Sequence, residues 1–280
     1  MAGPAPESQG PPNPPFIAPD PAMAKRKIHS SFMQRQGTDK AISTRWTWLI
    51  LLFQVIVPAS AIISLYAVLT DASFDITNMG FLLLLFLAAL LISIALAVTH
   101  AIVASKLVAR RDGHFRRDAV MRDGMMDHMN ATSYSTKIDL NVERWTLNTI
   151  HYSSQTSDRS PGLWAVMVAL IGIIPIFGTL LLMYFNALMT KDVHEHDEKQ
   201  RYFIDQFQRG MAKAGRPGDG ASNWHPLPVR NISMYAVLSV LTLGFFLPYW
   251  WYVNIVDMNT HIANQWNFEN ELVKTIQAEG

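Results

Sequence analysis

The sequence contains no cysteine. This absence excludes a disulfide scaffold, a cysteine-ligated zinc or iron–sulfur site, a c-type haem site and a cysteine nucleophile. Charge is also scarce, since only 16% of the 280 residues are Asp, Glu, Lys or Arg, and the formal net charge of +1 argues against nucleic-acid binding by the whole chain. The HExxH, GxSxG and GxxxxGK(S/T) motifs are missing as well. We therefore expect no cofactor and no enzymatic activity.

Charge is absent altogether from four windows of 25 to 27 residues each, namely 46–70, 80–105, 163–189 and 232–256. A helix of 25 residues is about 38 Å long, enough to cross a hydrocarbon core of about 30 Å. Backbone groups in lipid must be paired within the segment, so these windows are expected to be helical. The sequence predicts an all-α, polytopic integral membrane protein with about four transmembrane helices.

The charges that flank the first two windows indicate an orientation. Five basic residues and Arg45 precede the first window against one acid, and six more basic residues follow the second window, whereas Asp71 and Asp75 are the only charges between the two. The positive-inside rule places the N-terminus and the 106–162 segment in the cytoplasm. We expect a multi-pass protein of the plasma membrane whose first two helices form a hairpin.

The second half of the chain leaves two topologies open. Pro175 lies inside the third window and Pro248 inside the fourth. Because proline is common in transmembrane helices, simple spans are preferred, with the 190–231 segment outside the cell. In the alternative, both windows are re-entrant, bent at Pro175 and Pro248, and their flanks are all cytoplasmic.

The segments between the windows differ in composition. Eight prolines among the first 21 residues predict a disordered tail that does not contribute to a core. The expected organisation is a tail (1–24), a basic juxtamembrane segment (25–45), a transmembrane hairpin (46–105), a basic amphipathic helix with a polar linker (106–162), a third transmembrane helix with an amphipathic helix (163–214), a Gly/Pro linker (215–231) and a fourth transmembrane helix with a C-terminal amphipathic helix (232–280).

Residues 107–130 have the pattern of a basic amphipathic helix. Its apolar side is marked by Phe115, Met121, Met125 and Met129. Its arginines are candidates for binding anionic lipid headgroups, and the alternative is that they only set the topology: Arg110, Arg111, Arg116, Arg117 and Arg122. The alternation of Ile138, Leu140 and Val142 suggests a short strand.

Two further amphipathic helices follow the third and fourth windows. Val193, Phe203, Ile204, Phe207 and Met211 line the first, and Ile255, Met258, Ile262, Leu272 and Ile276 line the second. The two helices share the same four residue types at the same spacing, which indicates a degenerate tandem repeat. The first helix has Asp192, His196, Gln200 and Phe203, and the second has Asp257, His261, Gln265 and Phe268. Residues 107–122 suggest a third, weaker copy around His114.

The fourth window carries a local signature. Thr242-Leu243-Gly244 is followed, four residues later, by Tyr249-Trp250 and then by an amphipathic helix. This arrangement over 232–276, with a weaker copy near 163–205, resembles a prokaryotic membrane family catalogued as domain of unknown function 4234. The resemblance implies a prokaryotic membrane protein and carries no established chemistry.

The aspartates and histidines of the same repeat are candidates for a metal site. An aspartate and a histidine four residues apart share a helical face and are able to hold a metal ion. The candidates are Asp192, His196, Asp257 and His261, which meet only if both amphipathic helices lie on one side of the membrane. The alternative, a solvated polar face, is preferred, because His194 and His196 point in different directions on a helix.

Three functions remain open. The first is a membrane-anchored interaction or scaffold protein with a cytoplasmic helical platform, whose partners are membrane lipids and a protein partner or a second copy of the chain. The second is a small transporter or channel with broken helices, its substrate bound by Gly172, Pro175, Gly178, Gly244, Pro248 and Asn254. The third, and least favoured, is a membrane metalloenzyme.

Overall fold

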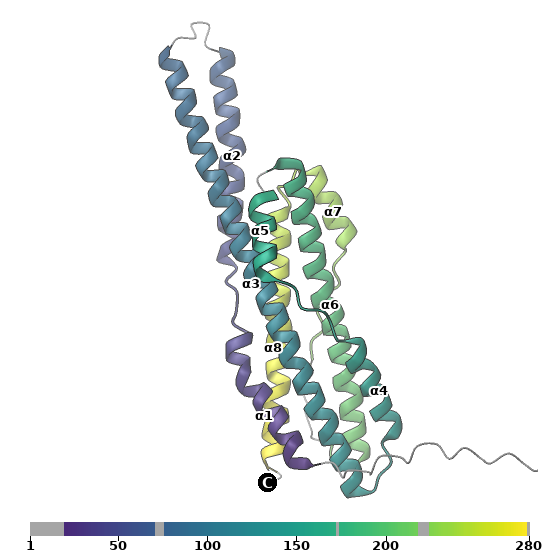
Figure 1. The fold of residues 1–280 in the computed structure, drawn as a ribbon. Coiled ribbons are helices and arrows are strands. Elements are labelled where there is room, and N and C mark those ends of the chain that lie inside the picture. The colour runs from purple at the N-terminus through teal and green to yellow at the C-terminus, as the bar shows by residue number, and fades with distance from the viewer. Residues whose placement is uncertain (1–19, 71–75, 172–173, 218–223, 279–280) are drawn as a thin grey trace, which may run out of the picture.

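The computed structural model describes residues 20–70, 76–171, 174–217 and 224–278, and all regular structure in these ranges is helical. The helices are α1 (Pro21–Thr38), α2 (Arg45–Thr70), α3 (Ile76–Thr136), α4 (Asn141–Ser153), α5 (Pro161–Ile171), α6 (Pro175–Lys213), α7 (Ile232–Leu241) and α8 (Leu247–Ala278). They pack side by side into an elongated bundle (Figure 1). The all-α prediction is confirmed for this part of the chain.

The short strand predicted around residues 138–142 is wrong. Lys137, the residue directly after α3, has a φ of 57°. This left-handed conformation stops the right-handed helix. The carboxylate of Asp139 then accepts a hydrogen bond of 2.9 Å from the backbone N–H of Asn141, the first residue of α4. The apolar alternation therefore marks a tight connection between two helices.

The α2–α3 hairpin extends well beyond the turns that join the other helices (Figure 1). α3 has 61 residues and runs along most of the molecule. Two segments, Arg45–Tyr66 and part of Met79–Thr136, are long and apolar enough to cross a membrane, and only 6% of the most apolar stretch of each is buried. The helix at the core of a soluble protein would be mostly buried, so this exposure favours contact with lipid.

The third and fourth apolar windows are each divided between two helices. The third is split between α5 and α6, and the fourth between α7 and α8. The prediction of one continuous helix across each window is therefore wrong. Pro175 and Pro248 are the first and second residues of the later helices, where a fixed φ and a missing N–H cost nothing.

Thr242, Leu243 and Gly244 form the turn between α7 and α8. Leu243 and Gly244 have φ values of 51° and 93°, and the Gly244 N–H donates to the carbonyl of Ser239 at 2.7 Å. The Thr242 hydroxyl accepts a 3.0 Å hydrogen bond from the N–H of Phe246 in the same turn. Gln54 of α2 donates to the Gly244 carbonyl at 2.7 Å, so the turn packs against the long hairpin.

The amphipathic helices predicted after the second, third and fourth windows are confirmed. Each is continuous with an apolar helix, and the apolar residues predicted for its inner face are buried. The lower half of α3 packs directly on these parts of α6 and α8. Arg122 donates to Gln200 at 3.1 Å, and Gln265 donates to Asp118 at 2.8 Å.

These contacts bear on the two topologies that the sequence leaves open for the second half of the chain. Segments joined by buried hydrogen bonds cannot lie on opposite sides of a bilayer. Residues 190–213 lie beside the lower half of α3, an arrangement that fits the re-entrant alternative better than simple spans, and the topology itself stays a prediction. Helices α5 and α7 have 11 and 10 residues, or about 15 to 17 Å, half of a hydrocarbon core.

The N-terminal region contributes a helix to the bundle. Most of the predicted disordered tail, residues 1–19, lies outside the described residues, but α1 begins at Pro21 after Asp20, whose side chain accepts from the N–H of Ala22. α1 crosses α3 closely at Gly124, where a β-carbon would lie 3.0 Å from the backbone nitrogen of Ile28. The expected juxtamembrane segment is thus a packed helix.

Candidate metal centre

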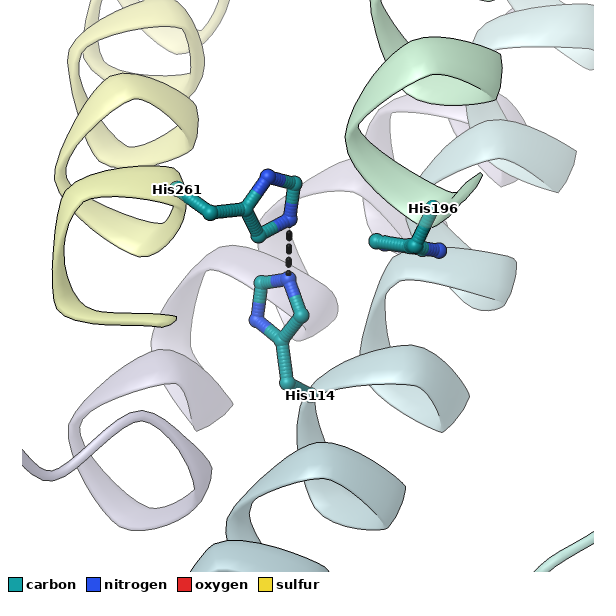
Figure 2. A group of neighbouring side chains, drawn as sticks. All are labelled: His114, His196 and His261. Atoms are coloured by element: carbon teal, nitrogen blue, oxygen red, sulfur yellow. Dashed lines mark hydrogen bonds between the residues drawn. The ribbon is translucent and has the colours of Figure 1, made fainter. Parts of the chain in front are cut away.

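Three buried histidines from three helices meet in the lower half of the bundle (Figure 2). His114 of α3, His196 of α6 and His261 of α8 are 0%, 4% and 0% exposed. One nitrogen of each lies within 4.8 Å of the corresponding nitrogens of the other two. Imidazole nitrogens grouped in this way are the ligand set of many zinc sites.

The three histidines occupy equivalent positions in the repeat. His196 and His261 are each followed by Gln at four residues and Phe at seven, and His114 is followed by Asp118 and Met121 at these positions. The residues four positions after each histidine are polar, and those seven positions after it are apolar. All six are buried in the core below the histidines. The weak third copy is therefore a real structural equivalent, and its histidine completes the cluster.

Aspartates hold the outer nitrogens of two of the rings. The Nδ1 of His114 lies 3.1 Å from the Oδ1 of Asp39, and the Nδ1 of His261 lies 2.8 Å from the Oδ1 of Asp197. The Nε2 atoms of the same two rings face each other at 3.1 Å, as the dashed line in Figure 2 shows. Carboxylate–histidine pairs of this kind orient histidine ligands toward metal ions in many proteins.

If both rings are neutral, the chain of contacts from Asp39 through His114 and His261 to Asp197 is one hydrogen short. It has three polar contacts, and each needs a hydrogen between its two acceptor atoms. Two neutral imidazoles supply two hydrogens. If both Nδ1–H groups donate to the aspartates, two Nε2 lone pairs face each other, and that is the position in which a cation is stabilised.

Burial lowers the pKa of His114 and of His196. Desolvation lowers the pKa of His114 to about 4, although the adjacent Asp39 opposes the change. Desolvation, together with the nearby His261 and Arg122, also places the pKa of His196 well below its usual range. Burial raises the pKa of Asp39, but the contacts with His114, Arg117 and Trp266 bring it below its ordinary value. At neutral pH, His114 and His196 are therefore in the form that binds metals.

His196 is oriented differently from the other two. Its ring stacks on Phe115 with 3.9 Å between the ring centroids, and its Nε2 lies 3.5 Å from the Oδ2 of Asp118. Asp118 is itself paired with Arg122 at 2.8 Å. A half-turn of the His196 ring about its Cβ–Cγ bond exchanges the positions of its carbon and nitrogen atoms.

The two aspartates are fixed by further hydrogen bonds. Trp266 and Arg117 both donate to the Oδ2 of Asp39 at 2.8 Å. Trp224 and the backbone N–H of Leu227 donate to the two oxygens of Asp197 at 3.2 Å. Because their lone pairs are engaged, both carboxylates are held toward the imidazoles, and the site is organised before any ligand arrives.

The structure brings together only half of the metal candidates chosen from the sequence. His196 and His261 meet, whereas Asp192 pairs with Arg111 and Arg159 at 3.1 and 2.8 Å. Asp257 pairs with Arg230 and with His194. The residues that the sequence analysis missed are His114, Asp39 and Asp197. The repeat pattern pointed to the first, and Asp197 directly follows the candidate His196 in the chain, but nothing in the sequence indicates Asp39.

The arginines proposed as lipid ligands lie mostly inside the bundle. Arg110, Arg111, Arg117 and Arg122 are at most 5% exposed. Arg117, for example, is paired with Asp39 and Glu269 at 2.8 and 2.6 Å. The side chain of Arg116, which is 69% exposed, faces solvent beside Asp158. A surface array of five arginines for lipid headgroups does not fit this arrangement.

The transporter candidates are divided between the hairpin turns and the core. Gly172 lies outside the described residues, while Pro175 and Gly178 begin α6. Gly244 lies near a cavity of about 420 Å³ lined in part by Gln54, His100 and Thr179.

Pro248 is buried near the start of α8, and Asn254 lies further along the same helix. Asn254 is buried, donates to Asn186 at 2.8 Å and accepts from Thr190 at 2.7 Å. Its polar groups therefore join α6 to α8, and a substrate-binding role for this residue stays a prediction.

Fold and site together define a helical protein with two helices long enough to cross a membrane and a buried cluster of three histidines. No family model, curated protein or solved structure matches the chain. The resemblance of residues 232–276 to the family of unknown function therefore stays a prediction.

Proposed function

We propose that this protein is a membrane-anchored scaffold whose helical platform is clamped by a divalent transition-metal ion. The ion is held by His114, His196 and His261. One observation carries the proposal: two Nε2 atoms face each other at 3.1 Å while both Nδ1 atoms contact carboxylates. A metal ion between the rings would take the place of the proton that the contact between the two Nε2 atoms lacks.

The observed spacing suits a metal of the zinc class. With Zn–N bonds of about 2.0–2.1 Å and tetrahedral geometry, two ligand nitrogens lie about 3.3 Å apart, close to the 3.1 Å between His114 and His261. Three nitrogen ligands without sulfur suit Zn²⁺ and also Co²⁺, Ni²⁺ or Cu²⁺. Asp39 and Asp197 provide the outer-shell charge that balances such an ion.

Burial of the cluster favours a structural role. All three imidazoles are at most 4% exposed. Three histidines fill three positions of a tetrahedral ion, and burial of the cluster keeps bulk water and substrates away from the fourth. A closed site that joins α3, α6, α8 and the end of α1 rigidifies a platform, which is a property that an interaction protein needs.

The membrane placement follows from the apolar helices and the flanking charge. The α2–α3 hairpin crosses the bilayer, and the α5–α6 and α7–α8 turns enter it from the side of the platform. Short helices of 11 and 10 residues suit entry into one leaflet. The basic residues around the hairpin support a location of the platform and the N-terminus at the cytoplasmic face of the plasma membrane.

Metal analysis of the full chain tests the proposal. The protein is purified in detergent without added metal, and bound metals are measured by mass spectrometry. We expect about one equivalent of a transition metal per chain. His114→Ala and His261→Ala should lose it, while His194→Ala, which alters a neighbouring histidine outside the cluster, should keep it.

The same preparations provide the folding control. Circular dichroism reports whether each variant remains helical, and Co²⁺ titration of the wild-type protein reports a nitrogen-ligated tetrahedral site directly by its absorption spectrum. A helical wild-type protein that contains no metal, and binds Co²⁺ or Zn²⁺ more weakly than about 10 μM, would contradict the proposal. Equal metal content in the His114→Ala and wild-type proteins would contradict it too.

A further inference from the structure

A second site lies where the α2–α3 hairpin meets the platform. The α1–α2 connection and one face of α3 enclose a cavity of about 600 Å³. Its lining includes Trp46 at the start of α2 and Lys106, the first charged residue after the second apolar window. Both residues mark the depth at which a membrane-spanning hairpin leaves the hydrocarbon for the headgroup region.

Three cations line this cavity, and no acidic residue that the structure describes lines it with them. They are Lys40, Lys106 and Arg110. Among the residues that the structure describes, none of the three forms an ion pair with a carboxylate. The nearby Asp39 directs its carboxylate to His114, Arg117 and Trp266 on the other side of the connection.

The burial of Arg110 is the strongest sign of a ligand. This arginine is only 5% exposed, and its Nε has no hydrogen-bond partner among the described residues. Its other nitrogens donate to the side chain of Asn259 and to the backbone carbonyl of Asp39. A buried guanidinium that has only neutral partners retains a full positive charge, and an anion bound in the cavity would compensate it.

The remaining lining is apolar and aromatic. Ile42 is buried in the core cluster beside Trp46, and the ammonium group of Lys106 lies 4.6 Å from the centroid of the Trp46 ring. The cavity therefore combines a basic part with an apolar part that leads toward the exposed apolar faces of α2 and α3. An anion with an attached hydrocarbon chain satisfies both parts, whereas a free inorganic anion satisfies only the first.

We propose that this cavity binds the phosphate of an anionic phospholipid, with Lys40, Lys106 and Arg110 as its cationic ligands. The proposal depends on the membrane placement described above and not on the metal ion. Such a pocket fixes the orientation and depth of the platform at the membrane surface. Each basic residue near an anionic surface strengthens lipid association roughly fivefold.

Lipid binding to the purified full chain tests this proposal. The wild-type protein in detergent is mixed with phosphatidylglycerol, with phosphatidylcholine or with inorganic phosphate, and bound lipid is counted by native mass spectrometry while melting is followed by intrinsic fluorescence. We expect phosphatidylglycerol to bind at least ten times more tightly than phosphatidylcholine. The Lys40→Gln/Lys106→Gln protein should lose this preference, since both lysines are exposed and their replacement leaves the core unchanged.

The matched control is Arg116→Gln/Lys191→Gln, which removes two exposed positive charges outside the cavity. It should bind phosphatidylglycerol within twofold of the wild type. Equal losses in the two double variants would overturn the proposal, because they would indicate attraction by net charge alone. If inorganic phosphate raised the melting temperature as much as phosphatidylglycerol does, the bound phosphate would not need to come from a lipid, and the proposal of a lipid ligand would be overturned. A protein that stays in the membrane fraction but shows no headgroup preference would refute the pocket alone and leave the membrane placement standing.

Discussion

His114 of α3 and His261 of α8 face each other through their Nε2 atoms at 3.1 Å, although 147 residues separate them in the chain. Each ring is backed by an aspartate from a different segment, one at the end of α1 and one on α6. The contact therefore ties together four parts of the platform. Its properties lead to predictions about the metal, the packing, the topology and the pH dependence of the protein.

The backing aspartates should control metal affinity. Asp39→Asn and Asp197→Asn each replace an acceptor that orients a ligand imidazole, and loss of such outer-shell partners typically weakens metal binding 10- to 100-fold. Competition with a chromogenic chelator measures the change. The control is Asp205→Asn on α6, where the carboxylate is 45% exposed and pairs with Arg209 at 2.9 Å; metal affinity should stay within about twofold. Unchanged affinity in both site variants would show that the aspartates do not support a metal ligand.

The close approach of α1 to α3 should be needed for the site. A β-carbon at position 124 would lie 2.9 to 3.0 Å from three atoms of Lys27 and Ile28, one of them in the backbone, so Gly124→Ala should push α1 away from α3. Because Asp39 follows directly after α1, the variant should lose stability by about 1–3 kcal/mol and also bind metal more weakly. Denaturant unfolding and chelator competition measure the two effects.

Gly210→Ala is the matched control for this substitution. There the closest atoms belong to the flexible end of Met129, at 2.5 and 3.2 Å, and a methionine side chain is able to move aside. We expect a smaller loss of stability than at position 124 and no change in metal affinity. A Gly124→Ala protein as stable as the Gly210→Ala protein would refute the tight crossing.

Cysteine labelling should place α6 and the hairpin tip on opposite sides of the membrane. The chain has no native cysteine, so a single introduced cysteine is the only thiol. With an impermeant maleimide on intact cells, Thr70→Cys at the end of α2 should be labelled. Tyr202→Cys on α6, which is 50% exposed, should react only after permeabilisation. Met33→Cys on α1 serves as the control for the cytoplasmic face, and labelling of Tyr202→Cys in intact cells would contradict the re-entrant arrangement.

The stability of the platform should fall as Glu269 ionises. Burial raises the pKa of this carboxyl from 4.5 to about 7, although Arg117 and Gln265 oppose the shift. A folded-state pKa above the unfolded value stabilises the fold below about pH 4.5, and this contribution is lost as the pH rises through about 7. The loss amounts to at most about 3 kcal/mol.

Replacement of Glu269 by Gln isolates this titration. The Glu269→Gln side chain keeps the shape and does not ionise, so the difference in unfolding free energy between variant and wild type should shift in favour of the variant between pH 5 and pH 8. Groups that titrate in both proteins cancel in this difference. A difference that is constant with pH would mean that Glu269 ionises in the fold as it does in water.

The sequence predicted the parts of this molecule that depend on local pattern. The charge-free windows predicted lipid-exposed helices, and the spacing of Phe203, Phe207 and Met211 predicted a buried helical face, because a period of 3.6 residues places such side chains on one side. The windows did not distinguish one long helix from two short ones. Pro175 and Pro248 suit both a kinked span and the start of a second helix. Only the packing of α5 and α6 against α3, and of α8 against α2 and α6, selects the second.

The histidine cluster, too, was predictable from the sequence only in part. The shared spacing around His196 and His261 is written in the sequence, and so is the weaker copy around His114. The sequence alone did not determine that three helices bring these histidines within reach of one another, nor that Asp39 and Asp197 approach them from elsewhere in the chain. Such contacts depend on the relative rotation and depth of packed helices, which the burial of whole faces sets and a local pattern does not encode. The amino-acid sequence thus determined the helices, their apolar faces and the absence of thiol chemistry, while the tertiary structure alone decided which polar side chains share the core.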